Sequence, residues 1–378
     1  MLKLTRRGLI QGALAAVAGA GAAASLPRTI ASAASPDAGG AVKRGSIKLA
    51  EVLSPNQPQS LRLARQIGIT HAITNVSGLL RRVERGQYEE VLANMKKQFA
   101  EAGLAVAGVE SHPVGAERIK LGVEGRDEEI QNYIAAIEAL GKVGIPMVCY
   151  NWMAGIGWLR TRVDLPERGG ALTSEFDYKT AEDRGLTRWG KISEEKIWEN
   201  LVYFQKAVIP VAEKAGVKMA LHPDDPPISP LRGIGRILTS AANYRKVMEI
   251  VPSPINGITF CQANFLLMGE DIAALAKEWC QQKKIFFVHY RDVRGTKEHF
   301  NETFHDNGPT NMVKMLQVLS ENGFDGPIRP DHAPTLEGES NENPGYAMGG
   351  KVLAIGYMKG IMDALGIPYE REPAVQKR

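Results

Sequence analysis

Four short apolar runs in the second half of this 378-residue chain each end on a side chain that can bind a metal ion. The runs cover residues 218–222, 257–261, 285–289 and 326–331, and they end on His222, Cys261, His289 and Asp331. Runs of this length, bounded by turn residues, are typical of buried parallel strands. Because the carboxyl ends of parallel barrel strands lie on one face, we expect these four side chains to meet and to hold one metal ion.

Four earlier apolar runs complete a pattern of eight strands. They cover residues 47–52, 72–76, 105–110 and 146–151. Helical periodicity follows between the strands and predicts helices at residues 88–102, 126–143, 194–215, 241–251, 272–282 and 310–321. Eight alternations of strand and helix favour a closed (β/α)8 TIM barrel of the α/β class over an open sheet. An open nucleotide-binding sheet would also need a G-x-G-x-x-G turn after its first strand, where this chain has Leu-Ser-Pro-Asn.

The N-terminus has the features of a twin-arginine (Tat) export signal. Arg6-Arg7 precedes a mildly apolar stretch rich in alanine and glycine, and Ala31-Ser32-Ala33 matches a small-residue cleavage site. The stretch is too weakly apolar for a good transmembrane helix, so we expect no stable membrane anchor. The sequence therefore predicts a signal peptide at 1–33, a linker at 34–46, a single catalytic barrel at 47–368 and a charged tail at 369–378. We expect the Tat export machinery to deliver the mature protein to the periplasm or to secrete it.

Charge and cysteine content exclude two classes of protein. The formal net charge is +4, but Lys3, Arg6, Arg7 and Arg28 fall in the predicted signal peptide, which leaves the mature chain near neutral. No basic stripe remains to indicate a nucleic-acid partner. Three cysteines, a small and odd number, argue against a disulfide framework. The sequence does not distinguish helix faces that pack on the barrel from faces that could form a homo-oligomer.

Two imidazoles, one thiolate and one carboxylate can bind Mn²⁺, Fe²⁺, Co²⁺ or Zn²⁺. The carboxylate favours manganese or iron, whereas the thiolate favours zinc or iron. Each ligand alone is a weak signal, since a lone histidine is often a polar rim residue and a lone cysteine a small buried apolar group. Their agreement at the ends of four successive strands carries the prediction of a divalent metal site.

Other polar groups point to the same face of the barrel. Glu110 ends the third strand and Asn151 the fourth, while Arg291 and Arg329 lie beside the predicted ligands. Either arginine could hold a substrate carboxylate or serve a structural salt bridge. A metal ion and arginines suit the removal of a proton next to a carboxylate, because they stabilise the charge that develops on the oxygen atoms.

The predicted acid and base of this reaction are His332 and Tyr346, which follow the eighth strand. Asp224 and Asp225 follow His222 and could orient the ligands. His299 and His305 could contact substrate from the loop after the seventh strand. Residues 152–193 and 332–350 form connections long enough to be lids or binding elements.

Several motifs closely resemble the D-mannonate dehydratase family. They are Val148-Cys149-Tyr150-Asn151-Trp152-Met153, Val288-His289-Tyr290-Arg291-Asp292-Val293, Arg329-Pro330-Asp331-His332 and Asn343-Pro344-Gly345-Tyr346, together with Glu110-Ser111. The similarity extends over residues 47–365. It implies a (β/α)8 barrel that converts D-mannonate to 2-keto-3-deoxy-D-gluconate with Mn²⁺ or Fe²⁺. It also implies that His222, Cys261, His289 and Asp331 bind the metal, and that His332 and Tyr346 are the acid and base.

The chain departs from the family pattern only in its first half. Ala50-Glu51-Val52 stands where members resemble Trp-Tyr-Gly, and Ser77 stands where a histidine is usual. Val114-Gly115-Ala116-Glu117 replaces Val-His-Glu, and Gly157 replaces an aspartate. The metal-binding half is therefore retained while the substrate wall is altered, which, together with the export signal, suggests a paralogue that acts on another sugar acid or sugar.

Two alternatives to a hydro-lyase stay open. A sugar isomerase or epimerase on the same barrel would use the same metal and proton abstraction but would return the proton. An exported sugar-binding protein without catalysis would be expected to lack a metal ligand or His332, and all of these residues are present. The fold alone does not decide among them.

Overall fold

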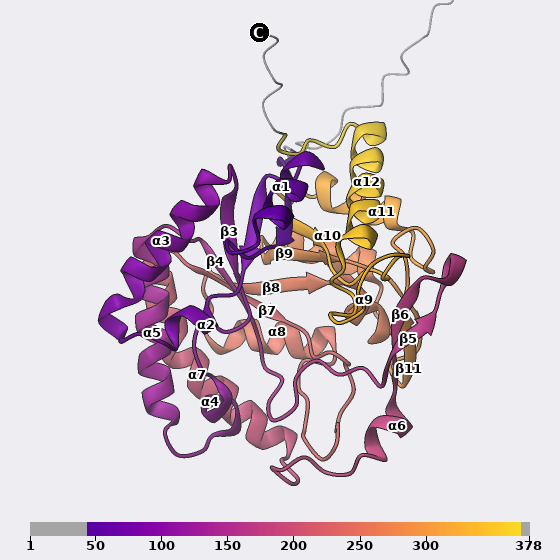
Figure 1. Ribbon diagram of the computed structural model, residues 1–378. Helices are drawn as coiled ribbons and strands as arrows, with labels where there is room; N and C mark the ends of the chain where they lie inside the picture. Colours follow the sequence, from indigo (N-terminus) through magenta and orange to yellow (C-terminus); the bar gives the residue numbers. More distant parts are fainter. Residues whose placement is uncertain (1–43, 372–378) are drawn as a thin grey trace, which may run out of the picture. The chain divides into compact units, whose positions relative to one another are not determined.

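The computed structural model describes residues 44–371. The predicted signal peptide, nearly all of the predicted linker and the end of the predicted tail lie outside the described residues. Eight parallel strands close into a barrel in the order β1-β12-β9-β8-β7-β4-β3-β2 (Figure 1). Their bounds are β1 (Lys48–Val52), β2 (His71–Thr74), β3 (Ala105–Glu110), β4 (Met147–Asn151), β7 (Lys218–His222), β8 (Asn256–Cys261), β9 (Ile285–Tyr290) and β12 (Pro327–Pro330). The predicted barrel and its eight strands are confirmed.

Helices surround the barrel. They are α1 (Pro58–Gln66), α2 (Ser77–Leu80), α3 (Tyr88–Glu101), α4 (Glu117–Leu121), α5 (Arg126–Lys142), α6 (Tyr178–Glu182), α7 (Glu194–Ala215), α8 (Ala241–Ile250), α9 (Gln262–Leu267), α10 (Ile272–Gln281), α11 (Met312–Glu321) and α12 (Met348–Leu365). The predicted helices correspond to α3, α5, α7, α8, α10 and α11, with ends that agree to within two residues. Helix α12 carries several glycines, which weaken its helical signal.

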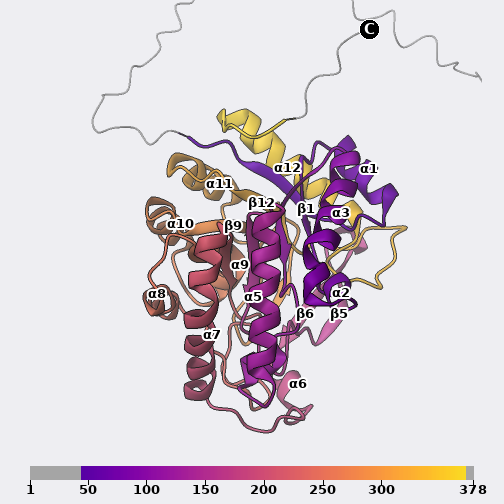
Figure 2. The same ribbon diagram turned by 90° about the vertical axis from the view of Figure 1, so that its left-hand side faces the viewer.

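The longest helix, α7, illustrates how the sequence sets helix ends and packing. The Ser193 side chain accepts a hydrogen bond from the backbone N–H of Lys196 and caps the N-terminus. Gly216 ends the helix in the left-handed conformation, with φ of 68°. Leu201 and Phe204, three residues apart, are both fully buried, so one apolar stripe faces the barrel. Figure 2 shows α7 beside α5 on the outside of the barrel.

Small side chains inside the barrel leave its carboxyl end free for a site. Ala50, Ala107 and Ala220 belong to the interior cluster, which Phe286 and Phe287 help to fill. The larger core lies between the strands and the helices, where fully buried aromatic rings such as Trp279 pack. The barrel interior is thus a packed core, as this fold requires.

A second, antiparallel sheet joins two of the loops on the active-site face. Its strands are β5 (Arg162–Pro166), β6 (Leu172–Asp177), β10 (Val293–Gly295) and β11 (His299–Glu302), in the order β10-β11-β6-β5. It lies beside the barrel in Figure 1. Two short 3-10 helices, Arg85–Gln87 and Arg168–Gly170, complete the elements. The predicted loop at 152–193 is therefore largely folded, but its strands are short and polar and gave no clear strand signal.

The end of the described chain packs back on the first strand. Backbone hydrogen bonds join Ile47 to Pro368 and Glu370, and Tyr369 is buried. The first residues of the predicted charged tail therefore belong to the barrel. Within residues 44–371, no helix is both long enough and apolar enough to cross a membrane.

Candidate metal centre and active site

A pocket of about 120 Å³ opens at the carboxyl end of the barrel. Strands β3, β4, β7, β9 and β12 and the loops that follow them supply its walls. The lining residues are Glu110, Ser111, Cys149, Asn151, Met153, Trp158, His222, Asp225, His289, Arg329, Asp331, His332 and Tyr346. Eight of these thirteen residues were selected from the sequence as metal ligands, substrate contacts or acid and base, and a ninth, Asp225, as a supporting group.

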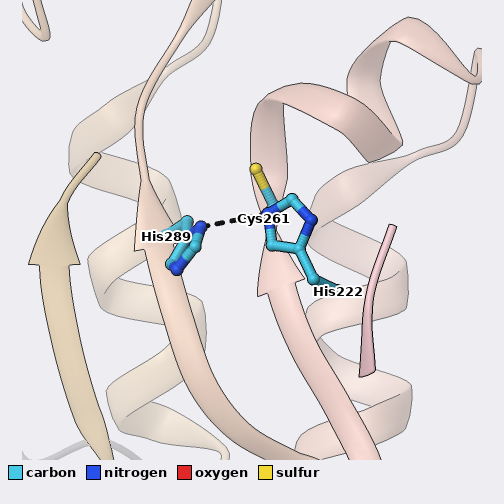
Figure 3. A group of neighbouring side chains, drawn as sticks. All are labelled: His222, Cys261 and His289. Carbon is cyan, nitrogen blue, oxygen red and sulfur yellow. Dashed lines mark hydrogen bonds between the residues drawn. The ribbon is translucent and has the colours of Figure 1, made fainter. Parts of the chain in front are cut away.

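Three of the four predicted ligands form one compact group. The ligand atoms of His222, Cys261 and His289 all lie within 4.8 Å of one another. Figure 3 shows the two imidazoles facing each other, with the Cys261 sulfur beside them. The distance between His222 Nε2 and His289 Nδ1 is 3.1 Å. Two nitrogens bound to one ion at roughly 2.1 Å lie about 3 Å apart when they are neighbouring ligands, so this spacing fits a shared metal ion.

The partners of the two imidazoles leave suitable lone pairs for a metal. His222 Nδ1 lies 2.7 Å from the carbonyl oxygen of Pro223 and donates its proton there, which leaves Nε2 free. His289 Nε2 lies 3.6 Å from Glu110 Oε1. A proton on Nε2, beside this carboxylate, leaves Nδ1 free to face His222. Two lone pairs facing each other at 3.1 Å repel each other unless a cation or a proton lies between them.

Asp331 adjoins this group but is also held by arginines. Its Oδ2 lies 3.5 Å from His289 Nδ1 and 3.9 Å from Cys261 Sγ. The same oxygen is 2.8 Å from Arg291 Nε, and Oδ1 is 2.7 Å from an Arg329 nitrogen. Asp331 is therefore within reach of a metal held by the triad, and the two arginines fix its orientation.

The buried charges around the pocket do not balance. Three guanidinium groups form salt bridges with four carboxylates. The arginines are Arg160, Arg291 and Arg329, and the acidic residues are Glu110, Asp225, Glu302 and Asp331. With the imidazoles neutral, as they must be to bind a metal, one negative charge is uncompensated, and a thiolate at Cys261 would add a second. A divalent cation supplies the missing charge, so the donor set and its surroundings fit the metal that the family implies.

Protonation of two ligands reflects the same imbalance. Burial opposes ionisation of Cys261, but Arg291 and the two imidazoles lower the pKa of its thiol to about 5. Cys261 is therefore a thiolate at neutral pH, the form that binds metals. Burial and Arg329 oppose protonation of His289, yet Asp331 and Glu110 raise its pKa well above the ordinary value. The cluster thus favours a positive charge at this position.

The two predicted substrate arginines have different places. Arg329 lines the pocket, and its guanidinium makes two hydrogen bonds to Glu110, at 2.6 and 3.0 Å. Arg291 is completely buried below the pocket and is paired with Asp225, Glu302 and Asp331. The prediction that Arg291 clamps a substrate carboxylate therefore does not match its position: its donors are already used by protein carboxylates. The structural salt bridge is the alternative that this arrangement fits.

His332 and Tyr346 meet in the pocket. His332 Nε2 lies 3.1 Å from the Tyr346 hydroxyl, and Nδ1 lies 3.1 Å from Glu302 Oε1. The Trp158 ring packs 5.2 Å from the imidazole. Glu302 fixes the proton on Nδ1, so Nε2 is the nitrogen that can exchange a proton with substrate or tyrosine.

Glu302 and Arg160 are functional neighbours that the sequence did not reveal. Glu302 ends β11 in the second sheet, and Arg160 lies 2.5 Å from it and 2.6 Å from Asp225. Burial opposes ionisation of Glu302, but Arg291 and Arg160 lower its pKa to about 2. It is therefore a carboxylate that holds His332 and both arginines. No local motif marks either residue, because the pairing of distant loops brings them together.

The remaining predicted residues divide between the pocket and its surroundings. Asn151 lines the pocket, and its Oδ1 accepts a hydrogen bond from the Met153 backbone. Asp225 also lines the pocket, whereas Asp224 is paired with Arg236 at 3.3 Å.

His299 is exposed and lies 2.8 Å from Glu175. His305 is buried against Tyr290, and burial lowers its pKa to about 4. Neither histidine is among the residues that line the pocket.

Comparison with known proteins identifies the family of this chain. The family described as D-mannonate dehydratase (UxuA) matches residues 53–189 and 183–372. The mannonate dehydratase of Streptococcus equi subsp. zooepidemicus is 35% identical over 302 residues, covering 73% of this chain and 82% of the relative. That of Thermotoga maritima is 34% identical over 313 residues, covering 74% and 86%. This chain belongs to the D-mannonate dehydratase family. It is accordingly an enzyme of the hydro-lyase class.

Solved structures support the same assignment. The mannonate dehydratase from Streptococcus suis serotype 2 matches with a TM-score of 0.75 and 29% identity, covering 88% of this chain and 99% of that one. A xylose isomerase domain protein from Planctomyces limnophilus matches with a TM-score of 0.53 and 15% identity, covering 81% and 93%. The second likeness shows the barrel fold alone. The D-mannonate dehydratase family thus accounts for both the sequence and the architecture.

Replacing Cys261 with serine should sharply weaken metal retention. The change removes a thiolate ligand, and even residues that only orient ligands alter metal affinity by roughly 10- to 100-fold. Metal content after dialysis of Mn²⁺-loaded protein measures the effect. Cys280→Ser is the matched control, because Cys280 is buried on α10 and lies outside the pocket. Equal metal content in both variants would contradict the role of Cys261.

Proposed function

We propose that this protein is a metal-dependent dehydratase that converts D-mannonate, or a closely related sugar acid, to a 2-keto-3-deoxy acid. The observation that carries the proposal is that His222 and His289 line one pocket with His332 and Tyr346, and that the buried Cys261 thiol adjoins the two imidazoles. The names of the relatives point to the same substrate. The triad and Asp331 would hold one divalent ion, with Mn²⁺ or Fe²⁺ proposed from the carboxylate and from the resemblance to the family.

The reaction removes a proton from C2 and expels the 3-hydroxyl as water. The resulting enol then gains a proton at C3 and becomes the 2-keto-3-deoxy acid. When bound, the metal ion would act as a Lewis acid that stabilises negative charge on the substrate oxygen atoms.

The chain's own groups provide the proton transfers. His332 Nε2 and the Tyr346 hydroxyl, 3.1 Å apart, can take the C2 proton and protonate the leaving hydroxyl. Glu302 holds the imidazole from its other nitrogen. Arg329 stands at the pocket wall, where its pairing with Glu110 and Asp331 holds these two carboxylates in place beside the substrate.

A direct test incubates Mn²⁺-loaded protein with D-mannonate and other aldonates in D₂O. We expect loss of the C2 proton signal by NMR together with a 2-keto-3-deoxy acid and one equivalent of water. Exchange of the C2 proton without a keto acid would instead identify an epimerase. A metal-loaded protein that leaves every acid unchanged would overturn the proposal.

His332→Asn should lower kcat while leaving the metal in place. The substitution removes the proton-exchanging nitrogen, and positioned acid–base groups contribute roughly 10²- to 10⁴-fold to rate. Turnover and metal content are measured on the same preparation. His299→Asn is the matched control, since His299 is exposed outside the pocket. A His332→Asn enzyme with full rate would remove His332 from the mechanism.

We also propose that the protein is exported by the Tat pathway and acts in the periplasm or outside the cell. The paired Arg6 and Arg7, the weakly apolar stretch and the Ala31-Ser32-Ala33 site support this proposal. Changing Arg6 and Arg7 together to lysine should keep the protein in the cytoplasm, unprocessed. Cell fractionation with immunoblotting measures this result, and Arg28→Lys is the control. Normal export of the double variant would argue against the Tat route.

A further inference from the structure

A second cavity adjoins the active-site pocket, and Tyr346 lines both. This distal cavity has a volume of about 470 Å³, whereas the pocket has about 120 Å³. It lies among the end of β1, the start of α1, the loop after β12 and the first turn of α12. Its lining residues are Val52, Leu53, Gln57, Ser60, Glu339, Ser340, Asn343, Tyr346, Ala347, Met348 and Lys351.

The charged groups of the distal cavity already have partners within the protein. Lys351 Nζ lies 2.5 Å from Glu51 Oε1, and both residues are almost fully buried. The Glu339 carboxylate accepts hydrogen bonds from the backbone N–H groups of Leu336 and Gly349, at 3.1 and 2.6 Å. The second of these donors belongs to the first turn of α12, so the positive end of that helix is also occupied. A ligand of the cavity gains little from carrying a charge.

Several neutral polar groups of the distal cavity are free to bind a ligand. Within residues 44–371, the side chains of Gln57, Ser60 and Asn343 make no hydrogen bond to another group of the protein. Tyr346 is 39% exposed, its hydroxyl reaches His332 inside the pocket, and Lys351 Nζ lies over its ring, 4.8 Å from the centroid. Two amides and a hydroxyl beside the edge of Tyr346 form a surface that suits the hydroxyl groups of a sugar.

We propose that the distal cavity is a subsite for a neutral sugar unit joined by a glycosidic bond to the sugar acid. The inference rests on the proposed function, because the acid would occupy the pocket while the attached unit extends past Tyr346. The C2–H and C3–O bonds break as before and water leaves. The glycosidic bond stays intact, and the product is a glycosylated 2-keto-3-deoxy acid. The preferred substrate is thus a disaccharide acid.

The test compares D-mannonate with two mannobionates, which carry a mannosyl unit on O4 or on O6 of mannonate. Mn²⁺-loaded protein is used for both turnover and calorimetric binding. We expect kcat/KM for one mannobionate to exceed that for D-mannonate by about tenfold or more, a difference of about 1.4 kcal/mol. Both mannobionates reacting and binding no better than D-mannonate would overturn the subsite.

Ser60→Trp provides a second test of the subsite, because the larger side chain is expected to fill the distal cavity. Ser60 is half-buried on α1, and its neighbour Gln59 is exposed, which makes Gln59→Trp the matched control. The ratio of kcat/KM for the mannobionate to that for D-mannonate should fall to about one in Ser60→Trp and stay unchanged in Gln59→Trp. An unchanged ratio in Ser60→Trp would contradict the proposal.

Binding separates this inference from the proposed function. If no acid is turned over, the dehydratase proposal fails, yet a mannobionate preference in Kd that Ser60→Trp removes would still support the subsite. If D-mannonate is turned over without any mannobionate preference, the subsite fails and the dehydratase stands.

Discussion

The uncompensated negative charge at the carboxyl end of the barrel is the constraint on which the rest of the site depends. Four carboxylates, three of them buried, and a thiolate share three guanidinium groups. Leaving a buried charge without its partner costs about 3–5 kcal/mol. Without a cation, such a cluster lowers the free energy of unfolding. A divalent cation that binds there offsets this loss. The same group of charged residues therefore determines both metal binding and the orientation of the acid–base pair.

The parallel barrel and the antiparallel sheet each supply residues of this charged cluster. The parallel barrel brings His222, Cys261 and His289 together because successive strands end on one face. The antiparallel sheet then adds Glu302, whose Oε1 contacts Arg160, Arg291 and His332. Glu302 thus links the ion pairs below the pocket to the imidazole that can move protons. The rigid barrel positions the ligands, and the loops complete the catalytic environment.

The strand-end ligands could be predicted because their spacing follows from a regular repeat. A strand ends where its apolar run ends, so His222, Cys261, His289 and Asp331 fall on one face whatever the details of packing. Glu302 and Arg160 could not be predicted in this way, since their meeting depends on the pairing of two polar loops. The role of Arg291 was left open between a substrate clamp and a salt bridge for a related reason: the sequence shows that an arginine is near the site, but not which carboxylates it contacts.

A diffraction experiment on crystals containing Mn²⁺ would test the metal centre most directly, with data collected above the manganese absorption edge. The account predicts one strong anomalous peak within about 2.0–2.4 Å of His222 Nε2, His289 Nδ1 and Cys261 Sγ, distances typical of such ligands. Asp331 is expected to be the fourth ligand. A peak elsewhere, or none at the triad in crystals with proven manganese content, would contradict the assignment of this cluster as the metal centre.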